Sequence, residues 1–196
     1  MRVHSSVKSV EVNHLLLKEP SVTFLADGML GSIARKLRFF GFDTLYIAHA
    51  HDNEILKIGI EQDRVILTAD KELFKRIVKA GTQGVLVSGV ATELEDLADI
   101  LAKSGVKSID MSCIGSRCSL CNGLLEERTS DQVKNDEDVV IVVPNRIIAC
   151  YNQFFQCMTC GKIYWEGGHF ERIRALARSI QARLIAKVCT TTPPLL

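Results

Sequence analysis

Short apolar runs alternate with longer amphipathic stretches between residues 21 and 103. The runs are rich in β-branched residues and have the length of buried strands: Ser21–Ala26, Thr44–Ala48, Arg64–Thr68 and Gly84–Val87. After each run, apolar residues recur every three or four positions, which predicts helices over residues 30–40, 52–60, 71–80 and 92–103. This alternation predicts an α/β fold in which helices cover both faces of a parallel sheet.

Two paired cysteine motifs stand in the second half of the chain, which holds all seven cysteines. Cys118-x2-Cys121 and Cys157-x2-Cys160 together supply four thiolates, the ligand set of a closed structural zinc site. A turn-prone residue follows each pair, as in zinc knuckles, so we expect a zinc ribbon. A disulfide or a catalytic thiol is the alternative, which the paired spacing and a reducing compartment disfavour.

The segment between the two motifs is acidic and then apolar. We expect a loop over residues 131–138 and a strand over Val139–Val143. This half of the chain carries little apolar mass, so metal binding is expected to supply its folding energy. The chain is thus predicted to divide into an extension (1–20) with an edge strand or hairpin within Ser6–Leu17, an α/β domain (21–104), a linker (105–116), the ribbon (117–168), a basic helix (169–190) and a flexible tail (191–196).

Acidic residues follow the predicted strands, where parallel α/β sheets gather their functional groups. Asp27 follows the first strand, Asp52 the second and Asp70 the third, with Glu54 two residues beyond Asp52. Clustered carboxylates require a cation, and oxygen ligands suit Mg²⁺ or Mn²⁺, which activate water for phosphodiester cleavage. Taken singly, each acid is more typical of a helix N-cap than of a metal site.

Two segments carry a resemblance to a known family: FLADGMLGSIARKLRFFGFDTLY and HDNEILKIGIEQDRVILTADKEL. Together with the cysteine motifs they resemble the PIN-like ribonuclease domain first named from the C-terminal region of the mut-seven exonuclease. The resemblance implies a Rossmann-like PIN fold with an added zinc ribbon, and an acidic site that binds divalent metal and cleaves RNA. By motif it assigns Asp27, Asp52 and Asp70 as catalytic acids, with Glu54 as a fourth. PIN nucleases often have a further acid near the fourth strand, where this chain has none before Glu93.

Basic residues near the acids are candidates for contacts with an RNA backbone: Arg35, Lys36, Arg38 and Lys71. Arg172 and Arg174 belong to the predicted C-terminal helix, the most basic segment of the chain. That helix either holds RNA or packs on the first domain with its arginines in water. His169, at a position where histidine recurs in the resembling family, either contacts RNA, reaches the acidic site or starts the helix in a surface turn.

A net charge of +1 excludes a polycationic nucleic-acid protein, so any RNA must be bound by local patches. No apolar run approaches the roughly 20 residues of a membrane span, and residues 1–20 lack a secretory signal pattern, so we expect a cytoplasmic protein. The favoured function is a metal-dependent ribonuclease. The alternatives are a non-catalytic RNA- or ribosome-binding adaptor, and a phosphoryl-transfer domain with Lys103 or Lys107 as the partner of a nucleophilic aspartate.

Overall fold

The computed structural model describes residues 22–190 of the protein. The expected edge strand or hairpin within Ser6–Leu17 therefore lies outside the described residues, as do the rest of the extension and the tail from residue 191. Strands and helices alternate through the first part as predicted: β1 (Phe24–Ala26), α1 (Gly31–Phe39), β2 (Thr44–Tyr46), α2 (Asp52–Glu61), β3 (Val65–Thr68), α3 (Lys71–Lys79), β4 (Gly84–Leu86) and α4 (Glu93–Lys103).

These four strands form one parallel sheet in the order β2-β1-β3-β4. Leu25 of β1 pairs with Leu45 of β2 on one side and with Ile66 of β3 on the other. The carboxyl ends of the strands all lie at one edge, here called the carboxyl edge, and the opposite edge is the amino edge. The strand order reverses between β1 and β3, which is where open α/β sheets place their ligands.

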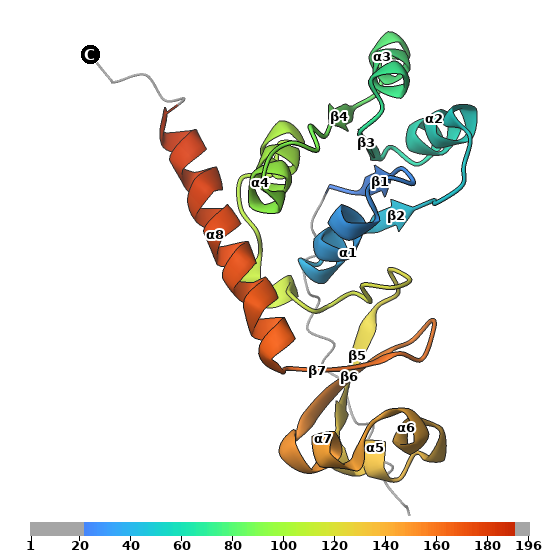
Figure 1. The fold of residues 1–196 in the computed structure, drawn as a ribbon, viewed down its shortest axis with the longest axis vertical. Coiled ribbons are helices and arrows are strands. Elements are labelled where there is room, and N and C mark those ends of the chain that lie inside the picture. The colour runs from blue at the N-terminus through green and yellow to red at the C-terminus, as the bar shows by residue number, and fades with distance from the viewer. Residues whose placement is uncertain (1–21, 191–196) are drawn as a thin grey trace, which may run out of the picture.

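Helices cover both faces of this sheet (Figure 1). Because side chains alternate along a strand, Leu25 and Ile66 point into a cluster with α2 and α3. Phe24 and Leu67 point the other way, into a larger cluster that α1 and α4 complete. The predicted fold class, a parallel sheet with helices on both faces, is confirmed.

A second, antiparallel sheet follows the short helix η1 (Met111–Cys113) and has the order β5-β6-β7. Its strands and the helices that cover it are β5 (Leu125–Thr129), α5 (Ser130–Lys134), α6 (Glu137–Val142), α7 (Asn145–Cys150), β6 (Gln153–Cys157) and β7 (Ile163–Trp165). The predicted strand over Val139–Val143 is wrong, because most of that segment is α6. The helices and strands also share a small apolar core of their own around Phe154, which the sequence had not led us to expect.

The last helix, α8 (Gly168–Thr190), returns to the first sheet and lies beside α4 (Figure 1). Its buried Ala177, Ile180 and Leu184 belong to the same cluster as Phe24 and Leu67. Of the two roles considered for this helix, packing on the first domain is therefore confirmed. The structure also shows that the apolar core of residues 22–103 is completed by residues near the C-terminus.

Candidate functional site

Thr68 joins two of the predicted catalytic acids at the carboxyl edge. Its hydroxyl donates to Asp27 Oδ2 and accepts from the backbone N–H of Asp70 at 2.9 Å. Asp27 Oδ1 accepts from the N–H of Met29 at 3.0 Å. Asp27 is 7% exposed and Thr68 is fully buried, so this carboxylate has a fixed place at the end of β1. The structure thus brings Asp27 and Asp70 together where the strand order reverses.

Asp70 also caps helix α3. Its Oδ1 accepts from the N–H of Glu72 at 2.7 Å and from that of Leu73 at 3.3 Å. The N-cap interpretation is therefore correct for this residue. Both hydrogen bonds of the cap fall on Oδ1, so capping leaves the second carboxylate oxygen for another ligand.

Asp52 is engaged differently. It is the first residue of α2, and its neighbour His51 is the N-cap, so the expected N-cap role of Asp52 is wrong by one position. Asp52 Oδ2 lies 2.9 Å from Nη1 of Arg76, whose second guanidinium nitrogen donates to Asn53. Together with Ala50, these residues line an open pocket of about 370 Å³.

The three predicted aspartates do not form a compact cation site in the described part of the chain. Their carboxylate oxygens do not all lie within 4.8 Å of one another. Thr68 contacts the Asp27 carboxylate and the Asp70 backbone N–H, so these two residues are neighbours at the carboxyl edge and offer oxygen ligands there, whereas Asp52 is paired with Arg76. Glu54 is exposed in the first turn of α2. The donor set, oxygens at one sheet edge, has the chemistry that Mg²⁺ and Mn²⁺ prefer.

Sequence reasoning does not identify Thr68 and Arg76, which contact the acids, or Glu93, which contacts the candidate RNA-binding residue Lys36. Glu93 begins α4, pairs with Lys36, and accepts from the Ser32 hydroxyl at 2.9 Å. Thr68 had a signal, because it opens the TxD motif that contains Asp70. Arg76 and Glu93 had none, because Arg76 contacts Asp52, which is 24 residues away in sequence, and Glu93 contacts Ser32, which is 61 residues away.

The predicted RNA-contacting residues fall into three groups. Exposed residues are Arg35, Lys71, His169 and Arg172. Lys36 and Arg174 are held in ion pairs, the latter with Glu166 at 2.8 Å. Arg38 is only 5% exposed, and its guanidinium donates to backbone carbonyls, so it is not available to a phosphate. Its exposure was misjudged because distant residues cover that side of α1.

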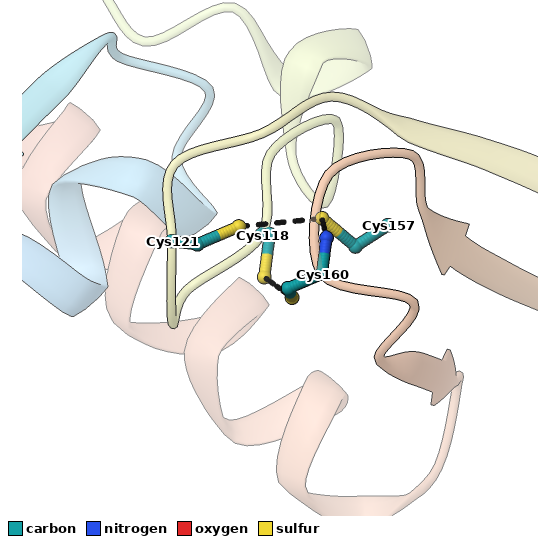
Figure 2. A group of neighbouring side chains, drawn as sticks. All are labelled: Cys118, Cys121, Cys157 and Cys160. Carbon is teal, nitrogen blue, oxygen red and sulfur yellow. Dashed lines mark hydrogen bonds between the residues drawn. The ribbon is translucent and has the colours of Figure 1, made fainter.

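The four cysteines of the paired motifs meet at one point (Figure 2). Their sulfur atoms all lie within 4.8 Å of one another. Cys118 and Cys160 sulfurs are 3.7 Å apart, and those of Cys121 and Cys157 are 3.4 Å apart. Four sulfurs bound to one zinc ion at about 2.3 Å are about 3.8 Å apart, so the cluster has the dimensions of a tetrahedral zinc site.

Charge in this cluster also indicates a cation. Burial opposes ionisation of Cys118, but hydrogen bonds from Tyr164 and the Cys121 backbone outweigh it and lower the pKa of that thiol to about 7. Burial raises the pKa of the Cys121 thiol to about 12, and the neighbouring thiols Cys157 and Cys160 add to the rise. The cluster therefore accepts one negative charge readily and resists a second, as expected for sulfurs that need a metal ion to ionise together.

The two cysteine turns share a backbone conformation. In the first knuckle (Cys118–Asn122), Asn122 has φ 73°, and in the second knuckle (Cys157–Gly161), Gly161 has φ 72°. Glycine adopts this conformation freely, and asparagine adopts it more readily than other side chains. In the second knuckle, the backbone N–H of Cys160 donates to the sulfur of Cys157 at 3.5 Å. The first knuckle has Asn122 where the second has Gly161, and the Asn122 side chain contacts the parallel sheet.

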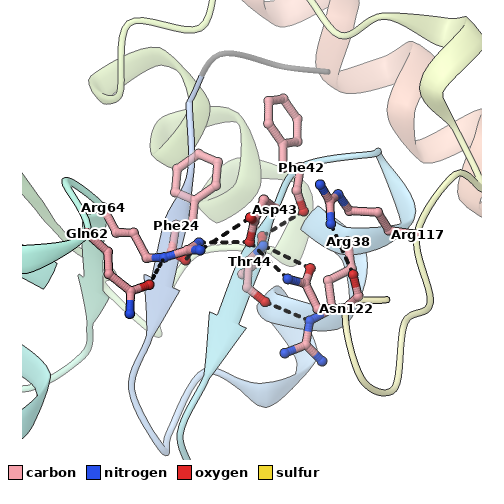
Figure 3. Close-up of polar contacts among 9 residues, drawn as sticks. All are labelled: Phe24, Arg38, Phe42, Asp43, Thr44, Gln62, Arg64, Arg117 and Asn122. Atoms are coloured by element: carbon pink, nitrogen blue, oxygen red, sulfur yellow. Dashed lines mark hydrogen bonds and ion pairs between the residues drawn. The ribbon is translucent and has the colours of Figure 1, made fainter. Parts of the chain in front are cut away.

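Asn122 and Arg38 fasten the first knuckle to the amino edge of the parallel sheet (Figure 3). Asn122 Oδ1 accepts from the N–H of Thr44 at 3.0 Å, and Nδ2 donates to Asp43 at 2.9 Å. Arg38 donates to the carbonyls of Thr44 at 2.8 Å and Leu120 at 2.8 Å. A zinc ion bound by the four thiolates would carry a net charge of about −2 and would provide this buried guanidinium with a counter-charge.

Asp43 extends the same network to the next strand. Arg64 donates to both of its carboxylate oxygens, at 2.7 and 3.2 Å, and also to the carbonyl of Phe24 in β1. Burial of Asp43 opposes its ionisation, but the hydrogen bonds from Arg64 and Asn122 outweigh it and lower the pKa of the carboxyl. The network therefore links the first knuckle to the amino ends of both β1 and β2.

The family model of the Mut7-C RNAse domain matches residues 22–177. The chain belongs to this family. The Mut7-C match covers the parallel sheet, the cysteine cluster and the first part of α8, and it supports a ribonuclease-type function with RNA as substrate. Among curated proteins and among solved structures, none matches the chain. No helix within residues 22–190 combines the length and apolarity needed to cross a membrane.

Proposed function

We propose that the protein is a ribonuclease that depends on Mg²⁺ or Mn²⁺ and hydrolyses RNA phosphodiester bonds at the carboxyl edge. One observation carries the proposal: Thr68 holds Asp27 and Asp70 together at the β1–β3 switch point, in a chain that belongs to a ribonuclease domain family. Carboxylates on a switch point are where an α/β sheet performs chemistry.

Asp27 and Asp70 would hold the divalent cation, with Asp52 and Glu54 as further oxygen donors. When bound, such a cation activates water and stabilises the charge that develops on the phosphate. Thr68 fixes the orientation of the Asp27 carboxylate, and the exposed Arg35 and Lys71 bind the RNA backbone beside it.

The cysteine cluster has a structural role in this proposal. Four thiolates close the coordination sphere of zinc, so the ribbon supports the nuclease domain and helps to bind RNA without performing chemistry. His169 and Arg172, exposed in the first turns of α8, are the proposed RNA contacts on that side. Reduced, metal-binding cysteines are typical of the cytoplasm, where we place the protein.

The test is a pair of aspartate-to-asparagine variants that differ only in location. Asn caps a helix as well as Asp does, so Asp70→Asn removes the charge and keeps the cap of α3. Asp110→Asn is the matched control, because Asp110 caps η1 by accepting from the N–H of Ser112 at 2.9 Å. Both variants should keep the stability of the wild type. With Mn²⁺ and labelled single-stranded RNA, only Asp70→Asn should lose cleavage, by 100-fold or more by analogy with the loss of a catalytic electrostatic group.

A second candidate function is a non-catalytic RNA- or ribosome-binding adaptor. The observation that favours it is that Arg76 holds Asp52 and that Asp70 serves as a helix cap. If wild-type protein binds RNA and cuts it no faster than Asp70→Asn does, the adaptor is correct. The phosphoryl-transfer alternative has no such support, since Lys103 ends α4 far from the acids and lies 3.8 Å from Asp99.

A further inference from the structure

Arg76 pairs with Asp52, one of the proposed metal ligands. It reaches from α3 to the first turn of α2, where one guanidinium nitrogen lies 2.9 Å from Asp52 Oδ2 and the other donates to Asn53. The contact occupies Oδ2 of Asp52 and places a positive charge beside that carboxylate, which opposes the binding of a cation there. The inference that follows rests on the proposed function, because it concerns how the acidic site is completed.

The same contact is open to solvent and to ligands. The side chains of Arg76 and Asp52 are 42% and 44% exposed, and both line the open pocket at the start of α2. Side chains of a helix lean toward its N-terminus, so Arg76 points back toward the carboxyl edge, where Asp70 caps the same helix. Arg76 therefore lies at the carboxyl edge, against the first turn of α2.

We infer that Arg76 is an RNA-phosphate ligand that Asp52 holds while the metal site is empty. Guanidinium groups bind carboxylate and phosphate with the same two-pronged geometry, so one partner can replace the other. When a divalent cation takes Asp52, Arg76 is freed for a phosphate oxygen of the RNA. When RNA takes Arg76, Asp52 is freed for the cation. Each ligand thus favours the binding of the other, as linkage requires.

This role predicts two changes of opposite sign when Arg76 is replaced. Arg76→Gln removes the competitor for Asp52, so Mn²⁺ should bind more tightly, by about two- to fivefold for a half-exposed ion pair. The same variant loses a phosphate contact, so RNA should bind more weakly. Misfolding would weaken both kinds of binding, and opposite signs therefore separate this role from a merely structural one.

The experiment uses the zinc-loaded full chain and the matched variant Lys75→Gln. Lys75 is the neighbour of Arg76 on α3 and pairs with Glu72, so its replacement removes the same charge without touching Asp52. Mn²⁺ binding is followed by the electron paramagnetic resonance of the free ion. RNA binding is followed at saturating Mn²⁺ by the fluorescence anisotropy of a short phosphorothioate oligouridine at several salt concentrations. The salt dependence should fall by about 0.7 for Arg76→Gln, the value of one phosphate contact on a single strand.

The inference is overturned if Arg76→Gln leaves the Mn²⁺ affinity unchanged or lowers it, or if it changes both affinities as Lys75→Gln does. Arg76→Lys provides a second variant in case the first is unstable. It keeps the charge but loses the fork of two nitrogens that contacts Asp52 and Asn53, so Mn²⁺ affinity should rise, by less than in Arg76→Gln. If the wild type binds no Mn²⁺ and Asp70→Asn cuts RNA as the wild type does, the proposed function itself fails, and with it this inference.

Discussion

Replacement of Asn122 by glycine measures how firmly the first knuckle is fastened to the parallel sheet. Glycine accepts the positive φ of this position, so Asn122→Gly removes the side chain without straining the backbone. Two hydrogen bonds are lost: one from the N–H of Thr44, a fully buried residue, and one to the carboxylate of Asp43. The first is worth about 1 kcal/mol, and the second, to a charged group, about 1.5–3 kcal/mol.

The free energy of unfolding should therefore fall by about 2.5–4 kcal/mol. For a chain of this size, that is a fall of roughly 5–16 °C in Tm. The assay is chemical unfolding of the zinc-loaded protein, with zinc content checked by elemental analysis. Hydrogen exchange at the Thr44 amide gives a local measure, because that N–H donates to Asn122 alone across the junction. Its protection should be lost while that of the β3 amides is kept.

The matched control is Gly161→Asn in the second knuckle. Gly161 has φ 72°, and an added Cβ would meet no heavy atom within 4 Å, so the substitution adds a side chain without a clash. Its effect should stay below about 1 kcal/mol, the cost of asparagine in this conformation. If Asn122→Gly is as stable as the wild type at equal zinc content, the fastening role of Asn122 is refuted.

Three further outcomes are expected. Removal of zinc by a chelator should deprive Arg38 of its anionic neighbour and release the first knuckle, which is measured as faster exchange at the Thr44 amide. The pKa of Asp43 is lower in the folded protein than in the unfolded chain, so its ionised form stabilises the fold above about pH 4, the pKa of an unfolded aspartate. This stabilisation is lost as the pH falls through the lower folded value. In the Asp43→Asn variant, the free energy of unfolding should therefore depend less on pH in the acidic range. Gly28→Ala would place a Cβ 2.4 Å from the carbonyl oxygen of Ala48, so it should displace the loop after Asp27 and lower nuclease activity more than Gly81→Ala, measured with the same labelled RNA.

The alternation of strands and helices was predictable because each element is short, periodic and locally encoded. The segment Val139–Val143 is an exception, because its local sequence predicts the wrong element. A β-branched run favours a strand, but Asp136 accepts from the N–H of Val139 and starts a helix. Val139 and Val143 then fall on one helix face and pack against Phe154 in the small core. Tertiary packing outweighs local propensity here.

In the candidate site, too, some features could be predicted from the sequence and others could not. Positions Asp27 and Asp70 could be predicted from their strand ends, and the cysteine cluster from its spacing. The engagement of Asp52 by Arg76 and the burial of Arg38 could not, since both depend on contacts between segments far apart in sequence. Hydrophobic periodicity predicts which face of a helix is apolar. It does not predict which polar residues are buried by a distant part of the chain.

The return of α8 to the first sheet has a consequence for synthesis on the ribosome. The four strands of the parallel sheet are complete once residue 86 has emerged, but Ala177, Ile180 and Leu184 emerge much later. Until then, the outer layer beside α4 exposes apolar surface that α8 will bury. The four clustered cysteines emerge before α8 does, so zinc has access to a nascent chain whose largest core is still open, and that core closes only after α8 has been made.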